Sequence, residues 1–169
     1  MRKTAFIIAI LLVATAVNPV SAKTLSDEQK GLISSNCSSI IFQLKKVQKE
    51  DSKNRVHLGA QYESISTNLM MNLNLRLVKN NMASAAIAEQ QTTFMSERDR
   101  FKNDFIGYAQ SLDELISIDC KNDPQKFYDK LKNVRNKRAE ISYSMGRLQD
   151  IINEHQEAIH EMIEGLKNE

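Results

Sequence analysis

Tryptophan is absent from this 169-residue sequence, and proline and glycine are scarce, with two and five residues respectively. The abundant residues are instead leucine, isoleucine, methionine, glutamate, lysine, asparagine and glutamine. Most of these favour helices, whereas a sheet of ordinary size needs more turn-forming glycine and proline and more β-branched and aromatic side chains. The composition therefore predicts an all-α fold.

The residue patterns of common catalytic sites are also absent. The sequence has no glycine-rich phosphate loop, no Cys-x-x-Cys, and no cysteine and histidine spacing of a zinc site. Glu157 and His160 form the one Glu-x-x-His pair, but a di-iron bundle needs a second such pair and two more inward glutamates. We expect no catalytic, cofactor-binding or metal-binding residues, no cofactor and no enzymatic activity.

The N-terminal segment has the pattern of a secretory signal peptide. Arg2 and Lys3 precede an apolar run from residue 5 to residue 17, and Pro19 stands just before the small residues Val20-Ser21-Ala22. The run is too short for a membrane-spanning helix, which needs about 20 apolar residues. We expect cleavage after residue 22, leaving residues 23–169 as a single helical domain that is secreted, periplasmic or in the cell envelope.

The net charge of the chain gives no reason to expect a polyanionic partner. Arg2 and Lys3 account for the formal net charge of +2, so residues 23–169 carry equal numbers of basic and acidic residues. A neutral chain is not attracted as a whole to nucleic acid or to anionic lipid. We expect no nucleic-acid binding, and no membrane span once the signal peptide is removed.

Three long helices follow from the hydrophobic spacing. The last begins at Asp123-Pro124, a helix-start pair, and its apolar residues then recur in alternating steps of three and four up to Leu166. The same spacing predicts a helix over residues 82–119. For the first segment, Ser26 and Gln29 fit a capping box and the spacing continues to Leu77, so we expect helices over about 26–79, 82–119 and 124–168.

The polar stretch of residues 48–59 leaves two architectures. An elongated antiparallel three-helix bundle or coiled coil follows if this stretch is helical, and a four-helix up-and-down bundle follows if a turn falls near residues 50–54. Cys37 and Cys120 are the only cysteines, and an even count in an exported protein favours a disulfide. At about 1.5 Å of rise per residue, the three-helix arrangement brings Cys37 close to Cys120, whereas the four-helix arrangement separates them by about 40 Å. We therefore favour three helices.

Polar residues interrupt the apolar seams at matching heights. In the three-helix arrangement Asp51, Asn54 and Arg138 meet at one level, and a buried charge requires a partner. We expect these residues to form a buried polar layer with a structural role in fixing register, with Arg135 and Tyr108 as further candidates. The same spacing places Glu63 near Arg98, and Gln91 near His155.

The expected function is that of an exported, non-enzymatic helical interaction or scaffolding protein with a protein partner. A second copy of the chain is one candidate partner. Basic bands at residues 45–55 and 126–138 face acidic residues of the middle helix in this arrangement. Leu25-Ser26-x-x-Gln29 resembles one repeat of small helical stress chaperones with the pattern Leu-Thr-x-x-Gln, over five residues. A periplasmic-type holdase chaperone is the alternative function.

Overall fold

The structure, a computed structural model, describes residues 24–167. The expected signal peptide, residues 1–22, and residue 168 of the expected last helix lie outside this range. Every regular element within residues 24–167 is helical and no strand occurs there, which confirms the all-α fold for this part of the chain.

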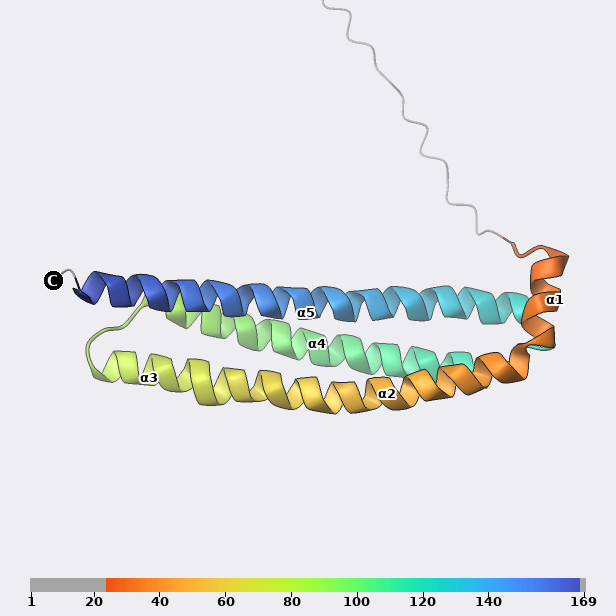
Figure 1. The fold of residues 1–169 in the computed structure, drawn as a ribbon, viewed down its shortest axis with the longest axis horizontal. Coiled ribbons are helices and arrows are strands. Elements are labelled where there is room, and N and C mark those ends of the chain that lie inside the picture. Colours follow the sequence, from red (N-terminus) through yellow and green to blue (C-terminus); the bar gives the residue numbers. More distant parts are fainter. Residues whose placement is uncertain (1–23, 168–169) are drawn as a thin grey trace, which may run out of the picture.

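The helices form an elongated bundle (Figure 1). The elements are, in order, α1 (Asp27–Ser35), α2 (Cys37–Ser64), the π-helix η1 (Ile65–Met71), α3 (Asn72–Lys79), α4 (Ala85–Ser117) and α5 (Pro124–Lys167). Helical backbone angles continue through Ile65 and Asn72, so α2, η1 and α3 form one uninterrupted rod, residues 37–79. The rod and α5 run in the same direction, and α4 runs opposite to both (Figure 1). Residues 50–54 lie within α2.

The first expected helix, residues 26–79, is broken at Asn36. The Asn36 backbone has φ −100° and ψ 7°, and α1 lies at a steep angle to α2 (Figure 1). Two side chains cause the break, because the Asn36 amide and the Ser35 hydroxyl both donate to the Leu32 carbonyl, at 2.9 and 3.2 Å. Such local hydrogen bonds compete with the helical backbone pattern. The prediction of one continuous helix from residue 26 is therefore wrong at this point.

The π-helix η1 shifts which side chains face the core. A π-turn holds more residues than an α-turn, so the inward stripe moves along the sequence. The three- and four-residue spacing of apolar residues in this segment would turn Ile65 and Leu69 inward, but the structure buries Ser66 and Met70 and leaves Leu69 63% exposed. The Thr67 hydroxyl donates to the Glu63 carbonyl at 2.8 Å, and the Asn72 side-chain amide donates to the Asn68 carbonyl at 3.1 Å.

The turn between α3 and α4 follows a standard helix-ending motif. Asn81 has a positive φ of 57°, which asparagine tolerates better than most residues. The Asn81 amide donates to Val78 and the Met82 amide donates to Leu77, so the last carbonyls of α3 are satisfied. Ser84 then caps α4, which runs from Ala85 to Ser117 where residues 82–119 were expected.

The core is centred on α4. Its buried side chains pack against α5 along most of its length and against the rod on the other side. Aromatic rings in edge-on contact connect Tyr62 of the rod with Phe94, Phe101, Phe105 and Tyr108 of α4, at centroid distances of 5.3 to 6.2 Å. The packing of α4 against α5 and of α4 against the rod buries one contiguous apolar core.

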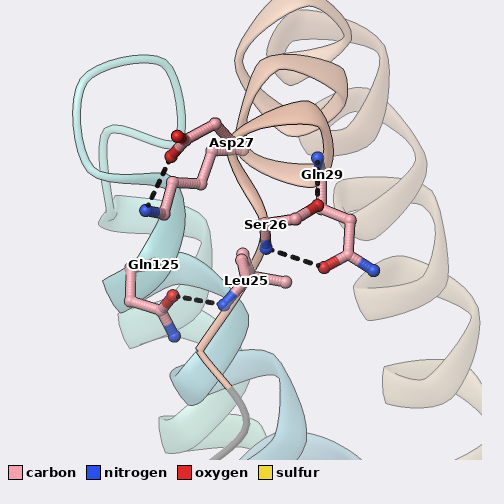
Figure 2. A network of polar contacts seen from close by, with 6 residues as sticks. Leu25, Ser26, Asp27, Gln29 and Gln125 are labelled. Atoms are coloured by element: carbon pink, nitrogen blue, oxygen red, sulfur yellow. Dashed lines mark hydrogen bonds and ion pairs between the residues drawn. The ribbon is translucent and has the colours of Figure 1, made fainter.

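A disulfide and a short polar network fasten one end of the bundle, which we call the disulfide end. Cys37, the first residue of α2, is bonded to Cys120 of the α4–α5 loop, with Cα atoms 5.5 Å apart. This confirms the pairing expected from the sequence. Figure 2 shows the network, in which the Leu25 amide donates to the Gln125 side chain of α5 at 2.9 Å and Ser26 and Gln29 form the expected capping box.

Removing the disulfide should lower stability. Because it spans 83 residues of sequence, the chain-entropy model assigns it about 4.5 kcal/mol of unfolding free energy. We expect Cys37→Ser/Cys120→Ser to show that loss in urea denaturation followed by circular dichroism. Reduced wild-type protein should behave like the variant, and an unchanged denaturation midpoint in both samples would contradict the entropic role.

Candidate functional site

Asp51 lies at the centre of a buried polar cluster to which the rod, α4 and α5 each contribute a side chain. Its carboxylate accepts a hydrogen bond from the Tyr108 hydroxyl of α4 at 2.6 Å and one from the Arg138 guanidinium of α5 at 3.1 Å. The Asp51 side chain is 12% exposed, whereas the Arg138 side chain is 57% exposed. The carboxylate is therefore enclosed, while the arginine reaches it from a solvated position.

Tyr108 acts in this cluster as a neutral donor. Burial raises the pKa of the Tyr108 phenol far above its usual value, and the hydrogen bond to Asp51 and the negative charge of that carboxylate raise it further. The hydroxyl therefore stays protonated at any physiological pH and donates to Asp51. Together with Arg138 it supplies the partners that a buried carboxylate requires.

Asn54 is not part of the cluster. The sequence placed it in the polar layer, but one turn after Asp51 it is exposed on α2, and that expectation is wrong. Three residues along a helix correspond to a rotation of about 300°, so Asn54 lies toward one side of the inward stripe that Asp51 occupies. Arg135 is also exposed and lies outside the cluster.

The second expected pair, Glu63 and Arg98, forms an ion pair. The Arg98 guanidinium lies 2.8 Å from the Glu63 carboxylate and also contacts Asp99 of its own helix at 3.0 Å. Glu63 and Asp99 are both largely exposed, so solvent weakens these ion pairs. They connect the rod to α4 at the rim of the core.

His155 contacts Gln90 rather than the expected Gln91. Its Nδ1 atom lies 3.3 Å from the Gln90 side-chain oxygen, while Gln91 accepts a hydrogen bond from Asn74 of α3. The two glutamines are neighbours on α4 and point in directions about 100° apart, so an error of one residue in register exchanges their partners. Burial lowers the pKa of His155 below its usual value.

Two apolar grooves lie between the rod and α5, on the side away from α4. Groove A, at the disulfide end, has a volume of about 580 Å³ and includes Leu32 of α1, Leu44 and Val47 of α2, and Leu131 and Arg135 of α5. Groove B, near the opposite end, has a volume of about 540 Å³ and is lined by residues of the rod and α5: Ile65, Asn68, Leu69, Met70, Asn72, Leu73, Arg76, Ile152, His155, Gln156 and Ile159. Both open on one face, which we call the open face.

The open face exists because the helices pack as two pairs. α4 contacts both the rod and α5, whereas the rod and α5 approach each other closely only at isolated points such as Asp51 and Arg138. No described residue lining either groove is acidic, and each groove contains one arginine, Arg135 or Arg76. Sequence reasoning missed this face, because most of its apolar residues, such as Leu44, Leu73 and Ile159, lie on the apolar seams that were expected to be covered by the other helices.

The basic bands are partly neutralised by ion pairs within and between the helices. Lys130 pairs with Glu114 of α4, and Lys132 with Asp129 on its own helix. Within residues 24–167, no three His, Cys, Asp or Glu side chains are grouped in a way that could hold a metal ion. Over the same residues, none of the helices combines the length and apolar character that crossing a membrane requires.

No known protein-family profile matches the sequence, and no curated protein or solved structure is significantly similar to it. The function must therefore be inferred from the geometry of this chain.

The two charged members of the cluster should differ in their contribution to stability. Asp51→Leu leaves the buried Tyr108 hydroxyl without an acceptor and should cost about 2 kcal/mol of unfolding free energy. Arg138→Met should cost about 1 kcal/mol or less, because the guanidinium is largely solvated. Urea denaturation measures both, with Arg135→Met, an exposed arginine on the same helix, as the control. A larger loss for Arg138→Met than for Asp51→Leu would contradict this assignment.

His155 should make stability depend on pH. Its pKa is lowered from 6.5 in the folded protein, so below that pH the unfolded chain binds the proton more strongly and stability falls. We expect the melting temperature to fall between about pH 7.5 and pH 5.5, and we expect His155→Gln to flatten that part of the curve. His57→Gln, at an exposed position, is the control and should leave the wild-type curve unchanged.

Proposed function

We propose that this protein is an exported, non-enzymatic interaction protein with a helical protein partner. We further propose that it is an elongated antiparallel three-helix bundle in which α1 is a short additional helix at one end. The unbroken helical backbone of the rod through residues 50–54 supports this arrangement over a four-helix bundle with a turn there. The apolar start of the sequence and the disulfide support export.

The observation that carries the proposed function is the open face. Its two grooves are lined by leucine, isoleucine and valine, and Leu32 and Leu69 are each more than half exposed at their edges. Apolar grooves between two helices are the usual receptor for the apolar side of a third helix. The α2 and rod residues that line the grooves span 39–47 in groove A and 65–76 in groove B, more than two helical turns in each case.

The charge of the grooves indicates the chemistry of the partner. Arg135 stands in groove A and Arg76 in groove B, no acidic residue of the described chain lines either groove, and Lys132 and Lys46 are sequence neighbours of residues that line groove A. A partner helix with glutamate or aspartate beside its apolar stripe would complement these cations, whereas a lysine-flanked helix would be repelled. The partner we propose is therefore an acidic amphipathic helix.

A labelled peptide tests this proposal. We expect an amphipathic peptide with leucines at helical spacing and flanking glutamates to bind, measured by fluorescence anisotropy, about tenfold more tightly than the same peptide with flanking lysines. Leu69→Glu should weaken binding of the glutamate peptide by about tenfold, because it places a like charge in groove B.

The chain offers a matched control for that variant. Leu75 lies on the same rod with almost the same exposure, 62% against 63% for Leu69, but it does not line a groove. Leu75→Glu should therefore bind the glutamate peptide as the wild type does. Equal effects of both variants, or equal binding of both peptides, would contradict the proposal. Suppression of client aggregation without regard to flanking charge would instead favour a holdase chaperone.

A further inference from the structure

The charge of α5 is divided along its length. Its first fifteen residues, 124–138, contain six basic residues and one acidic residue, Asp129. The remaining residues, 139–167, contain two basic residues and six acidic ones: Glu140, Asp150, Glu154, Glu157, Glu161 and Glu164. The basic part lies at the disulfide end beside groove A, and the acidic part lies toward the other end beside groove B.

One stripe of α5 runs along the open face from groove A to groove B. Its members recur every seven residues, and all are exposed or half-exposed: Tyr128, Arg135, Ser142, Gln149, Gln156 and Ile163. Tyr128 and Arg135 line groove A, and Gln156 lines groove B. A seven-residue repeat keeps one side of a helix turned toward a partner helix over its whole length.

The stripe on one copy of α5 is complementary to the same stripe on a second copy that runs in the opposite direction. When two α5 helices overlap fully in antiparallel orientation, residues whose numbers add to the same total lie opposite each other. Tyr128 then faces Ile163 of the second copy, and Arg135 faces Gln156. Lys132 and Arg135 also come within one helical turn of Glu157 of the second copy, because one turn is about 3.6 residues. A parallel pair would instead place basic residues against basic residues.

We propose that the open face pairs with the open face of a second copy of this chain, in an antiparallel dimer centred on α5. The two-fold axis lies across the middle of the helix, so each contact occurs twice, as in most homodimers. The apolar edges of grooves A and B are covered by the second copy, and the basic end of each α5 lies against the acidic end of the other. This inference rests on the proposed function, and the acidic part of α5 in the second copy is the acidic helix that covers groove A.

Sedimentation equilibrium of the oxidised protein tests the dimer and its orientation. Lys132→Glu/Arg135→Glu reverses two charges of the basic end, and Glu157→Lys/Glu164→Lys reverses two charges of the acidic end. We expect each variant alone to raise the dimer dissociation constant at least about tenfold, because like charges then meet at both ends of the interface. Raising sodium chloride to about 0.5 M should also weaken the wild-type dimer, since the charges are screened.

Mixing the two variants tests whether opposite charges hold the two copies together. In a one-to-one mixture each reversed charge again meets an opposite charge, so the dissociation constant should return to within about threefold of the wild-type value. The loss in each variant alone separates the orientations, because a parallel pair would already have like charges opposed in the wild type. Lys45→Glu/Lys49→Glu, an equal change of charge on exposed α2 positions that line neither groove, should dimerise as the wild type does. Circular dichroism of each variant verifies that the helices are intact.

Two outcomes would overturn this inference. One is a wild-type chain that stays monomeric at every concentration, and the other is a mixture that dimerises no better than its components. If the glutamate-flanked peptide still binds in either case, the open face serves another protein, and the proposed function stands without the dimer. If neither peptide binds while the wild type dimerises and mixing restores it, the proposed class of foreign partner is wrong and the dimer stands.

Discussion

The Cys37–Cys120 disulfide is the constraint on which the arrangement of the long helices depends. It fixes the first residue of the rod to the loop between α4 and α5, so the rod and α5 begin at the same end of the molecule. Because α4 connects the far end of the rod to this loop, the rod and α5 must run in the same direction with α4 reversed between them. With both helices packed against α4, the face between them is left open, and Asp51 and Arg138 bridge it at one level.

The parts that sequence predicted are those governed by long-range spacing. The start of α5 at Pro124, the pairing of the cysteines and the meeting of Asp51 with Arg138 all follow from helical rise and from apolar repeats counted over many residues. Errors of one or two residues do not disturb such estimates, because a disulfide or an arginine side chain can span a turn of helix.

The parts that sequence did not predict depend on local competition for hydrogen bonds. The break at Asn36 results from two side chains that bind the Leu32 carbonyl, and the π-helix at residues 65–71 shifts the inward stripe by one position. A shift of one residue buries Met70 and exposes Leu69. An error of one residue in register predicts Gln91 beside His155, where the structure has Gln90. Apolar spacing alone cannot distinguish such neighbours.

The position of the disulfide has a mechanical consequence. The bond closes residues 37–120 into a covalent ring that contains the whole rod and α4, while α1 and α5 leave the ring at adjacent points. A pulling force applied to the two ends of the domain would therefore pass from α1 through the two sulfur atoms into α5. The rod and α4 would carry no tension along their backbones, and α5 would detach from them as a single strip. Only the segments outside the ring, which contain α1 and α5, could lengthen under load. These segments make up less than half of the residues of the domain.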